Sequence, residues 1–266
     1  MNATTMTPST TQWRLHGVSV TGHRHRSDNM PCQDAFRHRS TGPDTFLLAV
    51  ADGAGSRSRS REGAEMAVEL ADLLFLPASP LPQDPRDVED FLRARFTVLR
   101  AEFIRRTQPH PEDFATTLTV VVHTGGWLGY LSVGDGFAVL RAGVRAGEPQ
   151  FHLLPQPAPV SEYSNEAFFV TSDDAAQRLQ TACVLDSEVT GILLCTDGLT
   201  QAAVEFPGNN RKRAKHNFVS RVLGAMERPD IGQEQEAAEL ARLLGSRRLA
   251  ADNADDKTLL RAVRGL

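Results

Sequence analysis

Cysteine is scarce in this sequence of 266 residues, and its few copies are poorly placed for the usual cysteine chemistries. Only Cys32, Cys183 and Cys195 are present, an odd number, far apart and without a CxxC spacing. This usage argues against both a disulfide framework and a zinc site. It is typical of a reducing compartment, so we predict a cytoplasmic protein.

Long apolar runs are absent as well. The first residues, MNATTMTPSTTQW, have neither the basic start nor the apolar stretch of an export signal. No segment reaches the roughly 18 consecutive apolar residues that a membrane-spanning helix needs. We therefore expect a protein that is neither exported nor embedded in a membrane, and that has no membrane partner.

A strong excess of basic charge is the third missing feature. The formal net charge is −4, whereas proteins that bind nucleic acid usually present a basic face. Two short basic runs exist, RSRSR at 57–61 and RKRAK at 211–215, but neither contains interleaved aromatic residues. Runs of this length are typical of solvated surface, so we expect no nucleic-acid partner.

The residues that are present are those of an ordinary globular protein. Hydrophobic residues make up 41% of the chain and charged residues 23%. A length of 266 residues is near the upper end of what one hydrophobic core serves. We therefore predict a single domain over 13–266, a disordered lead at 1–12, and a proline-rich flap or loop region at 145–180.

Two periodicities alternate along the chain. Apolar residues at steps of three and four predict amphipathic helices over 61–75, 87–106, 214–226 and 233–244. Short apolar runs predict strands within 13–22, 45–53, 190–196 and 252–263. The segment 116–143 is rich in β-branched and aromatic residues and is interrupted at GG and GDG, which predicts a three-stranded antiparallel meander. A simple parallel Rossmann arrangement is thereby excluded.

Carboxylates gather where the predicted strands end. The acids in question are Asp34, Asp52, Asp135, Asp197, Asp252, Asp255 and Asp256. Any one of them alone is typical of a turn, because aspartate hydrogen-bonds its own backbone. If the strand ends meet at one edge, however, several like charges would need a divalent cation. Ligands that are all oxygen favour Mg²⁺ or Mn²⁺, and a glycine after an aspartate would let a backbone carbonyl approach the ion.

Six motifs, in this order from about Gly17 to Val263, resemble those of a known family. The motifs are CQDAF, VADGAGS, FATTLTVVV, SVGDGFAVL, LLCTDGLT and DDKTLL. They resemble the metal-dependent serine/threonine protein phosphatases of the PP2C (PPM) type, in their bacterial form. The resemblance implies an α+β fold, a four-layer α-β-β-α sandwich of two mainly antiparallel sheets with helices on both outer faces. It also implies metal-dependent hydrolysis of phosphoserine and phosphothreonine in proteins.

The resemblance assigns metal binding to a set of six positions. These are Asp34, Asp52, Gly53, Asp135, Asp197 and Asp255. By this assignment, Asp52 would contact both ions of a pair of Mn²⁺ or Mg²⁺, and the Gly53 carbonyl would complete one coordination shell. Asp34 would bind a metal or orient the catalytic water, and Asp135 would serve a third, weaker ion. Two divalent ions about 3.5 to 4 Å apart make a water nucleophilic near neutral pH.

Protonation of the leaving group and binding of the substrate phosphate are assigned to the TGHRHRSDN segment. A side-chain acid would protonate the departing oxygen, and the candidates are His25 and its neighbour His23. Many family members have a phosphate-binding arginine where this chain has Asn29. Arg24 or Arg26 would replace it, because a guanidinium binds phosphate through two parallel donors.

Two further positions depart from the family pattern. Gln33 stands where an acid often precedes the aspartate of CQDAF, and Asp256 replaces the usual asparagine of the last motif. The missing phosphate-binding arginine leaves a second hypothesis open, a catalytically weak regulatory module that binds a phosphoprotein or kinase partner. A phosphotransferase with an aspartyl nucleophile ranks last, because Ala54 stands where that chemistry wants a second acid. The expected partners are a phosphoprotein substrate and a serine/threonine kinase.

Overall fold

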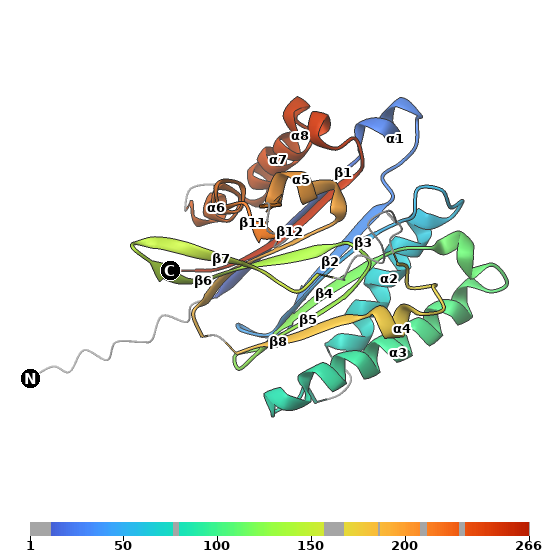
Figure 1. The fold of residues 1–266 in the computed structure, drawn as a ribbon, viewed down its shortest axis with the longest axis horizontal. Coiled ribbons are helices and arrows are strands. Elements are labelled where there is room, and N and C mark those ends of the chain that lie inside the picture. The colour runs from blue at the N-terminus through green and yellow to red at the C-terminus, as the bar shows by residue number, and fades with distance from the viewer. Residues whose placement is uncertain are drawn as a thin grey trace, which may run out of the picture.

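Figure 1 shows the fold in a computed structural model of the chain, which describes residues 12–76, 80–156, 168–185, 187–207, 212–228 and 232–265. The predicted disordered lead lies outside these ranges except for Gln12. Residues 157–167 of the predicted flap region lie outside them too. Within the described ranges, no helix combines enough length and hydropathy to traverse a lipid bilayer.

Two five-stranded antiparallel sheets form the centre of the molecule (Figure 1). The first contains, in spatial order, β1 (Trp13–Val20), β12 (Lys257–Arg264), β9 (Val189–Cys195), β6 (Phe137–Arg145) and β7 (Glu148–Leu153). The second contains β2 (Asp34–Ser40), β3 (Phe46–Asp52), β4 (Leu118–His123), β5 (Leu128–Val133) and β8 (Gln180–Val184). A short pair, β10 (Val204–Glu205) and β11 (Arg213–Ala214), stands apart from both.

Helices cover the outer face of each sheet (Figure 1). The long helices α2 (Ser60–Phe75) and α3 (Val88–Thr107) cover the second sheet, and α6 (His216–Gly224) and α7 (Gln233–Leu244) cover the first. The short helices are α1 (His23–Ser27), α4 (Ala175–Arg178), α5 (Thr200–Ala203) and α8 (Arg247–Asp252). Single 3₁₀ turns occur at η1 (Pro85–Asp87), η2 (Pro111–Phe114), η3 (Asp197–Leu199) and η4 (Ala225–Glu227). The predicted four-layer α-β-β-α sandwich is confirmed.

Three hydrophobic cores separate the four layers. One lies between the sheets, one beneath α2 and α3, and one beneath α6 and α7. Strand β3 contributes to two of them, because Leu48 and Val50 point toward the other sheet while Leu47 and Ala49 point toward the helices. A strand buried on both faces needs an unbroken apolar sequence, which is why this run shows no alternation.

The predicted three-stranded meander over 116–143 is wrong in one respect. β4 and β5 do pair as an antiparallel hairpin, with Leu118 opposite Val133. The chain then turns at Gly134, whose φ of 102° favours glycine, and β6 joins the first sheet between β9 and β7. β5 and the first half of β6 are buried, so their apolar pattern does not distinguish pairing in one sheet from crossing to the facing sheet. The GDG segment is therefore a crossover between sheets.

Candidate metal centre

Four strand ends bring predicted acids to one edge of the sandwich. Asp34 begins β2 and lies opposite Asp52, the last residue of β3, in the antiparallel register. In the other sheet, β9 ends just before Asp197 and β12 begins just after Asp255, and these strands are neighbours. A hydrogen bond from Thr196 to Asp34 joins the two sheets at this edge. The structure therefore brings these acids together across the seam between the sheets.

Two consecutive threonines fix the backbone of Asp52. The Thr116 hydroxyl and the Thr117 amide both donate to the Asp52 carbonyl, each at 2.9 Å. The Asp52 amide in turn donates to the Thr117 hydroxyl at 3.0 Å. Because both polar groups of the backbone are engaged, the carboxyl group at the end of β3 is held in one place. This is a physical reason for the Thr-Thr pair in FATTLTVVV.

Thr196 positions Asp34, a role that sequence reasoning missed. The Thr258 amide donates to Thr196 Oγ1 at 3.1 Å, which leaves the hydroxyl hydrogen free to donate elsewhere. It is directed to Asp34 Oδ2 at 2.8 Å. A threonine immediately before Asp197, in CTDG, was the available signal. It could not be interpreted because its partner lies 162 positions away.

Burial and mutual repulsion raise the pKa values of the acids at this edge. Burial, together with the charges of Asp256 and Asp197, raises the pKa of Asp34 to about 7. Burial raises the pKa of Asp52 well above its ordinary value, and the charges of Asp34 and Asp197 add to this. Burial followed by the charge of Asp255 raises the pKa of Asp197. A cation bound among these groups would reverse the effect.

Asp135 lies at the crossover turn between β5 and β6 and is more open to solvent. The surrounding strand ends still desolvate its carboxyl group, and with the charge of Asp197 they raise its pKa to about 6. The structure therefore places Asp135 near Asp197 but at the margin of the cluster. The positive charge of Lys212 opposes the rise in the pKa of Asp135, and Lys257 donates to the carbonyls of Asn253 and Asp255, at 2.6 and 2.8 Å.

The donor chemistry of this edge fits a hard divalent cation. The atoms Oδ1 of Asp34 and Oδ1 of Asp197 are buried and accept no hydrogen bond from any described residue. Buried acceptors without donors are costly unless a cation or water satisfies them. In the part of the chain that the structure describes, no three His, Cys, Asp or Glu side chains are arranged ready to hold an ion. The oxygens thus fit Mg²⁺ or Mn²⁺ in kind, and an ion would have to draw them closer together.

Asp256 anchors α1 to the edge where the acids meet. Its two oxygens accept hydrogen bonds from the Gly22 amide at 2.6 Å, the Gln33 amide at 2.6 Å and His25 Nδ1 at 2.9 Å. Both Asp256 and His25 are buried, with side chains 3% and 5% exposed. Asp256 therefore has a structural reason to be an acid here, because one side chain accepts from three donors. His25 lies near the loop after Asp52, since a Cβ at Gly55 would stand 4.0 Å from its Nε2.

The two candidate phosphate-binding arginines are placed differently. Arg24 contacts both carboxylate oxygens of Asp255 at 3.3 Å and lies against the loop at Gly55. Arg26 is exposed on the same short helix and forms no ion pair with a described residue. Asn29 has a φ of 57°, a left-handed conformation that asparagine adopts more readily than arginine. The backbone thus explains the asparagine at that position.

The glycines after the aspartates are required by close backbone packing. A Cβ at Gly53 would lie 2.6 Å from the Ser60 carbonyl oxygen, and one at Gly198 would lie 1.9 Å from the Asp256 carbonyl oxygen. We expected these glycines to give an ion access to a carbonyl. Packing alone forbids a side chain there, whatever the carbonyls bind.

Comparisons with known proteins agree with the fold. Serine/threonine-protein phosphatase 3 of Escherichia coli (strain K12) is 27% identical over 206 residues, covering 74% of this chain and 78% of that protein. A bacterial serine phosphatase structure matches with a TM-score of 0.66 at 16% identity, covering 96% of this chain and 99% of the other. The catalytic domain of the phosphatase PstP, in complex with two manganese ions, matches with a TM-score of 0.58 at 19% identity, covering 96% and 99%.

These structural likenesses concern the fold. The sequence itself matches the family described as protein phosphatase 2C over residues 21–245, which is most of the chain. The match includes five of the six motifs and the acids Asp34, Asp52, Asp135 and Asp197. This chain belongs to the protein phosphatase 2C family.

Proposed function

We propose that this protein phosphatase hydrolyses phosphoserine and phosphothreonine in proteins, using Mn²⁺ or Mg²⁺. The observation that carries the proposal is the convergence of Asp34, Asp52, Asp197 and Asp255, with buried oxygens that have no donor. The names of the relatives support it, since the Escherichia coli protein is a serine/threonine phosphatase and one structural neighbour contains two manganese ions.

In this proposal, the ions would be held by six residues of the edge. Two ions would be held by Asp52, Asp34, Asp197, Asp255 and the Gly53 carbonyl, and a third by Asp135. Such ions, when bound, make a water nucleophilic near neutral pH. Orientation of the water, binding of the phosphate and protonation of the leaving group would depend on side chains of the protein. Asp34, fixed by Thr196, would orient that water toward the phosphorus.

His25 and Arg24 are proposed to handle the leaving group and the phosphate. His25 Nδ1 is bound to Asp256, so only Nε2 is available to give a proton to the departing serine or threonine oxygen. Arg24 lies beside Asp255 and the Gly55 loop, which places a guanidinium where a phosphate would approach the acids. Arg26, which is exposed and forms no ion pair with a described residue, would assist only from the surface.

The test is hydrolysis of phosphoserine and phosphothreonine peptides by purified protein with millimolar Mn²⁺ or Mg²⁺. We expect phosphate release that stops when EDTA removes the metal and that is lost in Asp197→Asn. The matched control is Asp90→Asn, which changes an exposed aspartate of α3 and should retain full activity. Absence of metal-dependent release from the wild type would refute the enzymatic proposal.

A regulatory binding module is the second candidate function. The observation that favours it is Asn29, which stands where many family members have the phosphate-binding arginine. A module of this kind would bind phosphopeptide tightly without turnover, and Arg24→Ala would weaken that binding while no phosphate appears. The partners proposed under either function are a phosphoprotein and the serine/threonine kinase that produces it. A reducing cytoplasm suits the three cysteines, which form no disulfide.

A further inference from the structure

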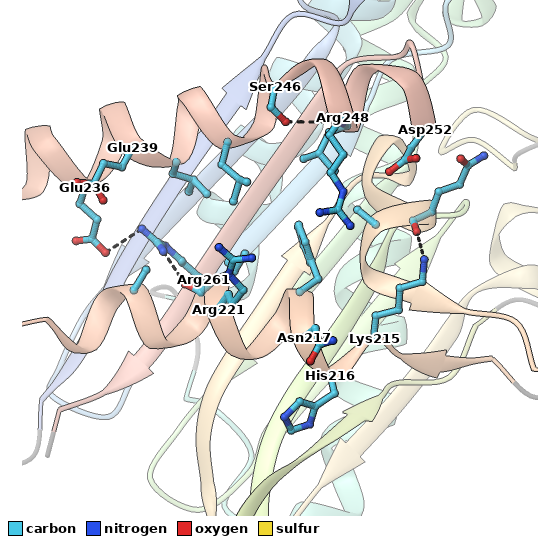
Figure 2. Close-up of a pocket in the computed structure, with 18 of the residues that line it drawn as sticks. Lys215, His216, Asn217, Arg221, Glu236, Glu239, Ser246, Arg248, Asp252 and Arg261 are labelled. Atoms are coloured by element: carbon cyan, nitrogen blue, oxygen red, sulfur yellow. Dashed lines mark hydrogen bonds and ion pairs between the residues drawn. The ribbon is translucent and has the colours of Figure 1, made fainter.

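A cavity of about 580 Å³ lies in the outer helical layer, and none of the six candidate metal-binding residues lines it. Its walls are α6 on one side and α7 and α8 on the other, and its floor is the outer face of the first sheet (Figure 2). Cavities of this size are typical of small-molecule sites in proteins. We call it the helix cavity.

The floor of the helix cavity carries buried positive charge. Arg261, 1% exposed, donates to Glu236 at 2.8 Å, and the same carboxylate also receives Arg14 at 3.1 Å. Two guanidinium groups therefore share one carboxylate, which leaves one positive charge in excess. In addition, the Nε of Arg261 is buried and donates to no described residue. Because this nitrogen is not accessible to solvent, Arg261 would act on a ligand in the cavity through its charge and not through a hydrogen bond from Nε.

Two further arginines face the same space. Figure 2 shows the side chains of Arg221, on α6, and Arg248, on α8, directed into the cavity from opposite walls. Neither guanidinium has a hydrogen-bond or ion-pair partner among the described residues. By contrast, Arg228 at the same cavity is neutralised by Glu239 at 2.6 Å. Arg221 and Arg248 thus form a pair of unneutralised donors across an opening.

The remaining lining has an apolar part and a smaller part of mixed charge. Leu240, Leu243, Val222 and Phe218 give the cavity apolar walls between α6 and α7. Glu205 and Asp252, which form no ion pair with a described residue, line the end nearest to α5 together with Lys215 and Arg248.

We propose that the helix cavity is a second ligand site, which binds a small amphipathic anion. Its phosphate, sulfate or carboxylate group is held between Arg221 and Arg248, above Arg261, and its apolar body lies against Leu240 and Phe218. Guanidinium groups recognise such anions through paired donors. The site is separate from the acid cluster, where an anion without a bound cation would be repelled, and the proposal does not depend on the proposed catalytic function.

The experiment uses a pair of fluorescent probes that differ only in charge. The probes are 8-anilinonaphthalene-1-sulfonate and the uncharged N-phenyl-1-naphthylamine, titrated into the full-length protein with Mn²⁺ present. We expect saturable binding of one sulfonate probe per chain, and binding of the uncharged probe at least tenfold weaker. The double variant Arg221→Ala/Arg248→Ala should bind the sulfonate probe at least tenfold more weakly, with an unchanged circular dichroism spectrum.

The matched control is Arg247→Ala, which removes an exposed arginine adjacent to Arg248 that does not line the cavity. It should leave probe binding within twofold of the wild type. The proposal is overturned if the wild type shows no saturable binding, if the uncharged probe binds equally well, or if Arg247→Ala weakens binding as much as the double variant. Displacement by octanoate or by phenyl phosphate then distinguishes a carboxylate ligand from a phosphate ligand.

Discussion

Two regions of buried charge lie along strand β12, and they are built in opposite ways. Near its first residue, Lys257, several aspartates lie close together, and some of their buried carboxylate oxygens accept no hydrogen bond from a described residue. Four residues further along, Arg261 is paired with Glu236 at 2.8 Å inside the outer layer. The second region is largely satisfied by its own residues, whereas the first is completed only by an added cation. Like charges gathered at a strand edge therefore indicate binding, and paired opposite charges indicate architecture.

Asp52→Asn should have the largest effect, because it removes an acid from the region whose like charges repel one another. We expect metal-dependent hydrolysis to fall more than a thousandfold, over ~4 kcal/mol in transition-state stabilisation. The metal-free variant should nevertheless be more stable than the metal-free wild type, because one of several repelling acids is gone. Initial rates and urea unfolding in EDTA measure both. A less stable metal-free variant would mean that the Asp52 carboxylate is already satisfied inside the protein.

Glu236→Gln should have the opposite effect on stability. It leaves the buried Arg261 without its counter-charge, so we expect a loss of about 3 kcal/mol in unfolding free energy. The effect lies at the low end for a buried ion pair, because the second partner, Arg14, has a side chain 41% exposed. Urea unfolding measures it, with the exposed Glu234→Gln on the same helix as the control. Equal losses of stability in the two variants would contradict the view that the Arg261–Glu236 pair stabilises the fold.

The pH dependence of the metal-free protein provides a third test. The pKa of Asp34, at about 7, lies above its unfolded value, so the folded state binds more protons between these two values. Stability should therefore fall as pH rises from 5 to 8, by roughly 2 kcal/mol. Saturating Mn²⁺ should raise the melting temperature more at pH 8 than at pH 5, since protons compete with the ion. Stability that rises with pH in EDTA would contradict this account of the acid cluster.

Asp256→Asn tests the acid that is satisfied within the edge. The asparagine usual in the family keeps one acceptor oxygen for the Gln33 amide and His25, but its NH₂ group would then face the Gly22 amide, so we expect a loss of about 1 to 2 kcal/mol. Thermal unfolding with and without Mn²⁺ measures it. A gain in stability would show that repulsion from the other acids outweighs the three hydrogen bonds of Asp256.

The smallest effect is expected at a surface ion pair. Arg61 and Glu65 are 2.9 Å apart on α2, and both side chains are 55% exposed. Arg61→Ala should therefore change the unfolding free energy by no more than about 0.5 kcal/mol. A loss comparable to that of Glu236→Gln would mean that burial does not decide the worth of an ion pair in this protein.

Local periodicity predicted most of the elements well. The helix expected over 61–75 is α2 (Ser60–Phe75), and α7 (Gln233–Leu244) has the expected bounds. In these segments the apolar spacing and the helix ends are set by neighbouring residues, so the sequence contains the relevant information. The sheet to which β6 belongs was not predictable, because buried strands of both sheets share one pattern.

In the candidate site, too, some residues could be predicted from the sequence and others could not. The acids of the edge could be named from the sequence because each follows or precedes a strand, and the structure places Asp34 directly opposite Asp52. The groups that hold them in position were missed, because Thr196 and Asp256 act on partners 162 and more than 220 positions away. Asp256 differs from the usual asparagine of the family, but neither residue's position in its motif identifies those partners. The assignment of ions to individual acids stays a prediction.

The hydrogen bond from Thr196 to Asp34 also ties the rigidity of the sandwich to its chemistry. It runs from the end of β9 in one sheet to the start of β2 in the other. A pair of ions held between the sheets would cross-link them at this edge. A substitution that allows the two sheets to shift relative to each other would then lower the affinity for metal before it measurably lowers the stability of the fold.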